Sequence, residues 1–278
     1  VSRWGACLNV SFDEFRERRD LADYLAPMKT LEAALARRPR ALAGVRLFVI
    51  HHATAEVLGL LKAFADAQCD SLTAFFVQYA GIVPNDYLET LMSLPPDAFR
   101  FYGLQKMESR FRLAGSYTLS RQFTPFSGLE PIEQALIEEQ PDFLNAMRLA
   151  AGHLFLKEAD AARRANRQLL LVEDGGYLAP LINRFCLEGK TLGEVFEHFR
   201  LPRPADAHHM PLADWLAPVF PGSIEHTKNG YDFLNEVAQA FGKLQFPALS
   251  IAVSDLKRGP EARACAVSIL NAAENILH

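Results

Sequence analysis

The stretch LLLVEDGG, from Leu169 to Gly176, joins an apolar run to an acidic pair and two glycines. Short apolar runs bounded by turn residues are typical of strands that are covered on both faces, as in a parallel sheet. Glycine lets the backbone turn sharply where such a strand stops. We therefore expect a buried strand with Asp174 at its carboxyl end, the edge where open α/β sheets bind ligands. The alternative is an ordinary turn in which Asp174 only caps the next segment.

Strand and helix patterns alternate along the rest of the chain. Further strands are expected at 45–50, 71–79, 99–102 and 249–253, and helices at 20–38, 55–67, 84–92, 130–139, 142–165, 191–199, 230–241 and 260–277. This alternation indicates a three-layer α/β fold with a doubly wound, mostly parallel sheet of the Rossmann-like or flavodoxin-like kind. We expect residues 1–278 to form a single domain, with a proline-rich connection at 201–221.

Composition excludes several classes of protein. Half of the 278 residues are hydrophobic, which is enough for a sizeable core. The formal net charge of -4 argues against a nucleic-acid or anionic-lipid partner. The four cysteines lie far apart without a CxxC spacing, so neither a disulfide framework nor a zinc site is indicated.

Metal, membrane and export signals are also missing from the sequence. His208 and His209, with Asp206 and Asp214 nearby, have no recognised metal-ligand spacing, so we expect no metal. The longest apolar region, 72–84, is too short to span a bilayer, and the first residues contain no signal-peptide core. We therefore expect a cytoplasmic protein without a membrane partner.

Three further segments carry chemically useful side chains. They are HATAE at 52–56, EHTKNG at 225–230, and PALSI at 247–251, the last leading to Ser254, Lys257 and Glu261. Together with LLLVEDGG, their order resembles the substrate-binding half of the S-adenosylhomocysteine hydrolase family. The similarity includes LAPM at 25–28 and AGVR at 43–46, and it is weak only between about 72 and 167.

The resemblance implies an adenine site after the first of these strands. His52, Thr54 and Glu56 stand in the family's His-x-Thr-x-Glu run, whose threonine and glutamate contact the adenine. A hydroxyl and a carboxylate can hydrogen-bond to the exocyclic amine and the ring-nitrogen edge of that base. The alternative is that Thr54 and Glu56 only form the N-terminal cap region of the next helix. We interpret the neighbouring His51 as a structural residue.

The resemblance also implies acid and base groups. Asp174 takes the place of the family's acid on the 5′ side of the nucleoside, and Glu173 is the conservatively changed acid before it. Lys257 takes the place of the lysine that contacts the ribose hydroxyls and helps to remove the 3′ proton, with Glu261 in place of its partner aspartate. A buried ammonium beside a carboxylate has the adjustable pKa that proton transfer needs. The alternatives are a surface lysine and an acid that complements the helix dipole.

Several positions depart from the family's pattern. His226 replaces a glutamate that contacts the sugar. Thr227 is the one threonine left on the nicotinamide side, and Asn229 replaces another. Ala252 stands where the family has an asparagine near the lysine, and we expect a divergent insertion at about 100–167. These changes argue against the family's usual contacts to the homocysteine end of the substrate. They also argue against the family's ordinary catalysis by this chain.

The family's reaction oxidises the ribose 3′-OH with a tightly bound NAD, and this hydride chemistry belongs to the cofactor. The sequence contains no GxGxxG run, so we expect no dinucleotide-binding domain within it, and NAD only if the natural protein has such a domain. The chain alone is then expected to be inactive.

Three hypotheses for the function follow from these residues. The first is the substrate domain of an NAD-dependent thioether hydrolase, which binds S-adenosylhomocysteine or a related adenine nucleoside. The second is a non-catalytic adenine-nucleoside-binding or regulatory module. The third is another nucleoside-processing enzyme in which His226 is the general base. A homo-oligomer is left open.

Overall fold

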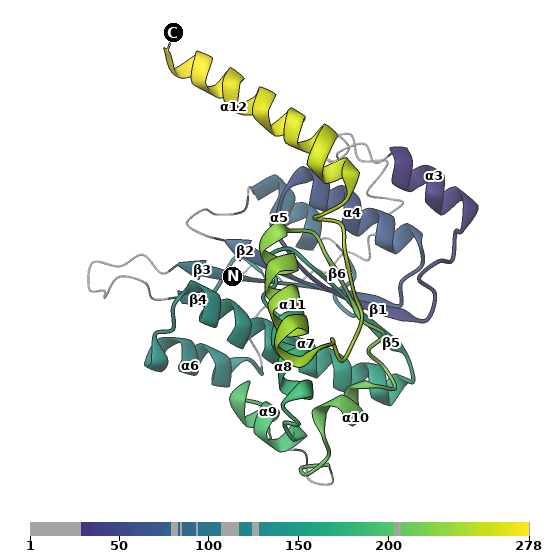
Figure 1. Cartoon of the computed structure of the whole chain (residues 1–278), viewed down its shortest axis with the longest axis vertical. Coiled ribbons are helices and arrows are strands. Elements are labelled where there is room, and N and C mark those ends of the chain that lie inside the picture. The colour runs from purple at the N-terminus through teal and green to yellow at the C-terminus, as the bar shows by residue number, and fades with distance from the viewer. Residues whose placement is uncertain are drawn as a thin grey trace, which may run out of the picture.

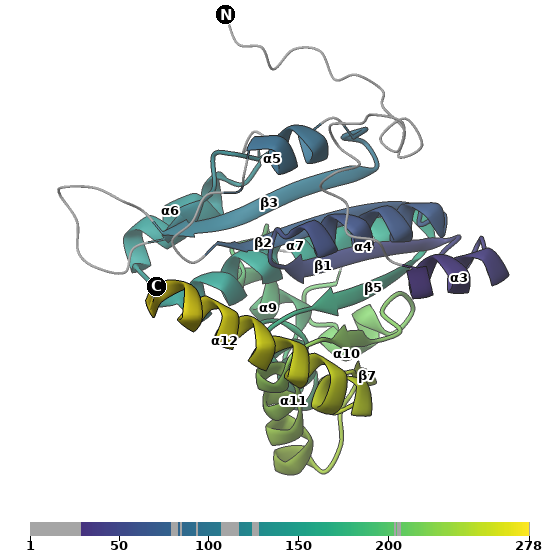
Figure 2. The same cartoon turned by 90° about the horizontal axis from the view of Figure 1, so that it is seen from above.

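The computed structural model describes residues 29–78, 83, 85–92, 94–106, 117–123, 128–202, 204 and 207–277. The strands within them are β1 Val45–His51, β2 Ser71–Gln78, β3 Phe99–Lys106, β4 Tyr117–Leu119, β5 Gln168–Glu173, β6 Ser223–Glu225 and β7 Ala248–Ser250. They form one seven-stranded sheet in the order β4-β3-β2-β1-β5-β6-β7. Neighbouring strands are parallel except for the antiparallel pair of β3 and β4. Figure 2 shows β3, β2, β1 and β5 side by side in that order.

The sheet reverses its direction of growth between β1 and β5. From β1 the chain adds β2 and β3 on one side, and it later returns to place β5 beside β1, with Val49 opposite Val172. β6 and β7 then extend the other side. Apart from the edge strand β4, this is the strand order of Rossmann-like folds, in which the reversal point opens a crevice at the carboxyl ends of the strands. The expected fold class is confirmed.

Helices cover both faces of this sheet. Their bounds are α3 Lys29–Arg37, α4 Ala55–Asp66, α5 Asn85–Met92, α6 Glu130–Glu139, α7 Phe143–Ala165, α8 Ala179–Leu187, α9 Leu192–His198, α10 Leu212–Leu216, α11 Lys228–Phe241 and α12 Ala262–Leu277, with a π-helical turn η2 at Lys257–Glu261. Successive side chains of β1 alternate between two cores. Leu47 and Val49 pack with α4 and α5, while Phe48 and Ile50 pack with α6 to α11. The apolar runs thus lie in strands buried on both sides, as the sequence predicts.

Several expected elements have other bounds. The strand expected at 99–102 continues to Lys106, and the one expected at 249–253 is Ala248–Ser250. The final helix begins at Ala262 instead of Pro260, because Pro260 lies inside the η2 turn. Residues 1–28 lie outside the described part, so the helix expected at 20–38 is seen only from Lys29, and LAPM is not seen.

Other elements were not expected from the sequence. The connection predicted at 201–221 contains the short helix α10, and the sequence predicted neither α8 nor β6. The region expected to be a divergent insertion, at about 100–167, contributes most of β3, all of β4 and α6, and the 23-residue helix α7. It is therefore part of the central architecture where it is described.

α12 extends away from the body of the molecule (Figure 1). Its side chains Val267, Ile269 and Leu270 are 50%, 68% and 64% exposed, so they do not pack on the domain's own sheet. None of the described helices has both the length and the apolar character needed to cross a bilayer.

Candidate functional site

The carboxyl ends of the parallel strands bring the expected site residues to one edge. Asp174 and His226 directly follow β5 and β6, and backbone hydrogen bonds hold both in place. The amide of Asp174 donates to the carbonyl of Ile50 at 2.9 Å, and the amide of His226 donates to that of Glu173 at 3.0 Å. Asp174 therefore lies beside the end of β1, at the reversal point where doubly wound sheets bind ligands.

Two histidines and an aspartate form the centre of this edge. His51 Nε2 lies 3.0 Å from His226 Nδ1, and His51 Nδ1 lies 3.5 Å from Asp174 Oδ2. These three side chains come from the ends of β1, β6 and β5 and are far apart in the sequence. Their contacts join the two halves of the sheet across its reversal point.

Both imidazoles of this group are neutral at pH 7. Burial, and to a lesser extent the nearby charges of His52 and Lys257, lower the pKa of His51 from 6.5 to about 4. Burial also lowers the pKa of His226 to about 4, helped by His51 and opposed by Asp174. Removing an imidazolium from water disfavours its charged form, and the carboxylate does not compensate for this cost.

The hydrogen bonds assign the tautomers of the two rings. The backbone amide of His52 donates to His51 Nδ1 at 2.9 Å, so this nitrogen carries a lone pair and His51 Nε2 carries the hydrogen. His51 Nε2 then donates to His226 Nδ1, which leaves the hydrogen of His226 on Nε2. Asp174 and His51 Nδ1 are two acceptors that face each other. The lone pair of His51 Nδ1 is already used by the His52 amide, so a hydroxyl or water that enters there can donate to Asp174.

Lys257 and Glu261 lie at the same edge, in the η2 turn after β7. Lys257 Nζ is 3.0 Å from Glu261 Oε1, and the two side chains are 27% and 47% exposed. The positive charge of Lys257 lowers the pKa of both His51 and His226. The edge thus combines a carboxylate, two neutral imidazoles and an ammonium, a set that can bind hydroxyl groups and exchange protons with them.

Two other carboxylates at the strand ends are fully buried and support the loops. Glu173 accepts hydrogen bonds from the amides of Leu178 and Ala179 at 2.9 Å each, at the start of α8. Burial, and after it the adjacent Glu225, raise the pKa of Glu173 to about 8. The carboxylate that caps the segment after LLLVEDGG is therefore that of Glu173, not that of Asp174. Glu173, which the resemblance assigns to the substrate, has both oxygens bonded inside the fold.

Glu225 holds the two-glycine turn. It accepts from the amides of Gly175 and Gly176 at 3.3 and 3.1 Å, and from the amide of Thr227 at 2.7 Å. Gly175 and Gly176 have φ angles of 121° and 65°, and a Cβ on Gly176 would lie 2.5 Å from the Cα of Gly230. Only glycine suits this turn. The sharp turn expected after the strand is confirmed.

The residues that the resemblance assigns to adenine lie after β1. Thr54 is the N-cap of α4, and its hydroxyl accepts from the amide of Val57 at 3.4 Å. Thr54 and Glu56 are exposed, and His52 is half-buried. Thr54 therefore caps α4, which was the alternative to an adenine contact. Thr54 and Glu56 are both exposed, so both side chains are accessible to a ligand.

The residues assigned to the nicotinamide do not form a dinucleotide site by themselves. The hydroxyl of Thr227 donates to Glu225 at 2.6 Å and accepts from the amide of Gly230 at 3.1 Å, so it is used within the fold. Asn229 is exposed in the first turn of α11. The turn after β1 reads His52-Ala53-Thr54 and has none of the glycines that let a backbone approach a pyrophosphate. These residues do not fit NAD, and we derive no step through it.

No metal centre is seen in the described part of the chain, where no three potential ligands lie close enough to share an ion. His208 and His209 are neighbours with ring centroids 4.8 Å apart, and His208 packs against Gly193. Asp206 lies outside the described residues.

Similarity to known proteins gives no assignment for this edge. No protein-family model and no curated protein matches the chain. The case for a site therefore depends on its geometry and on the residues that the sequence pattern selects.

Two residues of the edge had no functional role in the sequence analysis. His51 contacts both His226 and Asp174, although it was interpreted as structural. Its only signal was its position at the end of a strand, next to His52. Glu225 organises the glycine turn, but it ends a strand of three residues that is too short to show a pattern.

Proposed function

We propose that this chain binds an adenine nucleoside of the S-adenosylhomocysteine type, as the substrate domain of an NAD-dependent thioether hydrolase. One observation carries the proposal. Asp174, His226 and Lys257, which the resemblance selects from three distant segments, converge with His51 at the reversal point of the sheet. Crevices at such points are where open α/β sheets bind nucleotides and related ligands.

The chain's own groups suit the sugar of such a ligand. The carboxylate of Asp174 has no hydrogen-bond donor among the described residues and can accept from a hydroxyl or from water. His226 Nε2–H and the Lys257 ammonium are donors on the other side of the same edge. Thr54 and Glu56, at the start of α4, are the groups that would select adenine.

The proposal for this chain concerns binding. Hydride transfer needs a cofactor that the described residues do not hold, so catalysis would require a separate dinucleotide-binding domain. The second candidate, a non-catalytic adenine-nucleoside module, is favoured by His226. This residue replaces an anionic glutamate with a neutral ring that is already bonded to His51.

Calorimetric titration of the folded chain with adenosine and with S-adenosylhomocysteine tests the proposal. We expect binding by the wild type and at least a tenfold loss in Asp174→Ala and in Glu56→Ala, because a hydrogen bond to a charged group contributes about 1.5–3 kcal/mol. Glu138→Ala, which removes an exposed carboxylate from α6, is the matched control and should bind like the wild type.

Absence of binding by the folded wild type would contradict the proposal, as would binding that neither variant at the edge weakens. Binding of adenosine without S-adenosylhomocysteine would restrict the ligand to nucleosides that lack the amino-acid tail.

A further inference from the structure

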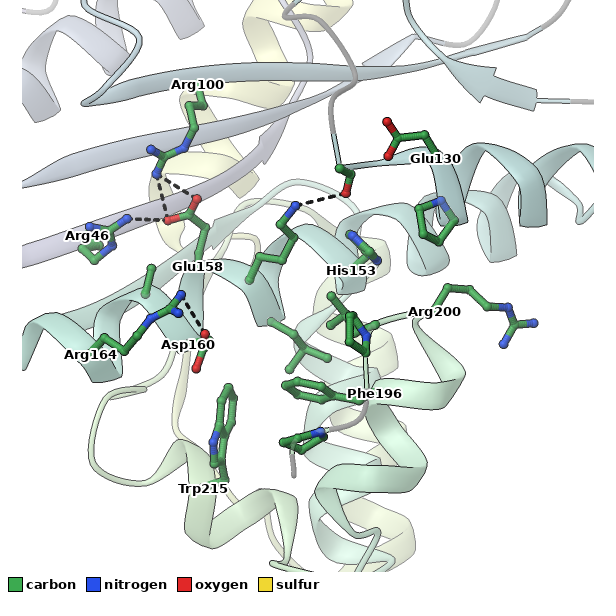
Figure 3. A pocket seen from close by; sticks show the side chains of 18 residues that line it. Arg46, Arg100, Glu130, His153, Glu158, Asp160, Arg164, Phe196, Arg200 and Trp215 are labelled. Atoms are coloured by element: carbon green, nitrogen blue, oxygen red, sulfur yellow. Dashed lines mark hydrogen bonds and ion pairs between the residues drawn. The ribbon is translucent and has the colours of Figure 1, made fainter. Parts of the chain in front are cut away.

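A second cavity lies at the opposite end of the sheet. It has a volume of about 810 Å³ and lies between α7, α10, the segment after α9, and the amino ends of β1 and β3 (Figure 3). Arg46 of this cavity lies roughly 16 Å along β1 from His51, at about 3.3 Å per strand residue. The cavity is therefore separate from the edge that holds Asp174. Its volume is within the range of about 300–1,000 Å³ that is typical of small-molecule sites.

Two guanidinium groups share a single carboxylate in the wall of this cavity. Glu158 of α7 lies 2.7 Å from Arg46 and 2.8 Å from Arg100, and it also accepts from the hydroxyl of Thr73 at 3.0 Å. The Glu158 and Arg46 side chains are only 11% and 15% exposed. One positive charge in this partly buried cluster is therefore not neutralised. A guanidinium in such a setting favours an additional anion.

Two buried polar atoms of the same wall have no hydrogen-bond partner in the described structure. One is Arg46 Nε, a donor, and the other is His153 Nε2. His153 is 2% exposed, and its Nδ1 lies 2.8 Å from the carbonyl of Phe199, so Nδ1 donates and Nε2 is an acceptor. Both atoms are closed off from solvent and therefore from the open cavity.

The rest of the wall combines apolar and aromatic side chains with the charged groups of Glu130, Lys157, Asp160, Arg164 and Arg200. Phe196 of α9 and Trp215 of α10 meet edge to face with ring centroids 5.6 Å apart, and both side chains are buried. Leu156 of α7 is fully buried beside them. In Figure 3 the Arg46, Arg100 and Glu158 cluster lies apart from the two rings. The cavity thus has a guanidinium cluster at one place in its wall and a pair of aromatic rings at another.

We infer that this cavity binds a small organic anion with a flat apolar body, whose carboxylate or phosphate meets Arg46 and Arg100. Each part of this ligand corresponds to a feature of the wall. The anion offsets the surplus positive charge of Arg46 and Arg100 around Glu158, and the ring packs on Phe196 and Trp215. The inference does not depend on the nucleoside proposal.

Fluorescence titration with anilinonaphthalene sulfonate tests this inference. The probe has an aromatic body, an N–H and an anionic group, and phenylnaphthylamine has the same body without the anion. Arg46→Met removes the surplus guanidinium while Arg100 still pairs with Glu158. We expect the affinity for the sulfonate to fall about tenfold, because a charge-assisted hydrogen bond contributes about 1.5–3 kcal/mol. The affinity for the uncharged amine should change less than twofold.

Two further variants keep the test independent of folding defects. Ala161→Trp fills the cavity from the half-buried outer side of α7 and should abolish the binding of both probes. Arg121→Met removes a guanidinium that is 73% exposed and lies outside the cavity, so it should change neither affinity. Circular dichroism would verify that each variant is folded.

Competition identifies the anion. Naphthoate and naphthyl phosphate are titrated against the bound sulfonate, and displacement by one of them assigns the site to carboxylates or to phosphate esters. Sulfonate binding that survives both Arg46→Met and Ala161→Trp would place the probe elsewhere and overturn the inference. Failure of both competitors to displace the sulfonate would overturn it as well.

Discussion

His51, His153 and His226 have pKa values lowered to about 4 but lie in different surroundings. His51 and His226 bond to each other at the carboxyl edge of the sheet, while His153 bonds to the backbone of Phe199 on the far side of α7. Burial is the largest cause in each case and lowers each pKa to about 4. A histidine that folds in its neutral form makes stability depend on pH.

His153 gives a prediction at the residue scale. Its pKa is 6.5 in the unfolded chain and about 4 in the folded chain, so between these values the unfolded chain binds more protons. The free energy of unfolding therefore falls as the pH falls through this window. We expect the loss between pH 7 and pH 5 to be smaller in His153→Gln than in the wild type, by at most about 2 kcal/mol.

Urea denaturation at the two pH values measures this difference. Equal losses in the wild type and in His153→Gln would contradict the assignment of a neutral buried His153. Titration of the other groups contributes to both proteins alike and cancels in the comparison.

The sequence predicts the position of Asp174 at this edge but not the contacts of the histidines, and the reason is physical. An apolar run that ends in Glu-Asp-Gly-Gly predicts where its strand stops, and Asp174 lies at that carboxyl end. The roles of His51 and His52 depend instead on the direction in which each side chain points. Neighbouring residues point to opposite faces of the sheet, and the pattern does not say which of the two histidines points toward Asp174 and His226.

At the element scale, the start of α11 and the glycine turn after β5 are packed against each other. A Cβ on Gly230 would lie 2.0 Å from Glu225 Cδ, and Glu225 in turn binds the amides of Gly175 and Gly176. Because Glu225 is fully buried, it has little room to move. Glu225, at the end of β6, thereby fixes both the start of α11 and the glycine turn after β5.

Gly230→Ala should therefore destabilise the protein by about 1–3 kcal/mol or more, the usual cost of forcing extra atoms into a packed interior. Gly259→Ala is the matched control, because a Cβ there meets nothing within 4 Å. It should change the free energy of unfolding by less than about 1 kcal/mol. Urea denaturation of both variants checks this, and equal effects would mean that the contact with Glu225 does not constrain Gly230.

The elements that were not expected lack local signals. The N-cap position of α8, Leu178, makes no side-chain cap, because the amides of Leu178 and Ala179 are bound by Glu173 instead. A helix that begins in this way has no capping residue in its own sequence. β1 and β2, by contrast, are apolar runs of sufficient length and were predicted almost to the residue.

At the scale of the whole molecule, α7 and the sheet separate two candidate sites. Glu158 of α7 binds Arg46 of β1, Thr73 of β2 and Arg100 of β3, so it ties three strands to the helix at their amino ends. The carboxyl ends of β1, β5 and β6 carry the other site. The alternation of strands and helices predicts the layers. The place of β5 beside β1 is a long-range pairing that no local pattern specifies.

The most direct test of the account is to determine which end of the sheet binds adenosine. We would follow the imidazole resonances of the eight histidines by NMR at pH 7 while adenosine is added, with assignments from single His→Gln variants. The account predicts that the signals of His51 and His226 shift together and saturate with one dissociation constant, while that of His153 stays unchanged. Saturable binding that shifts His153, and leaves His51 and His226 unmoved, would contradict a nucleoside site at the carboxyl edge.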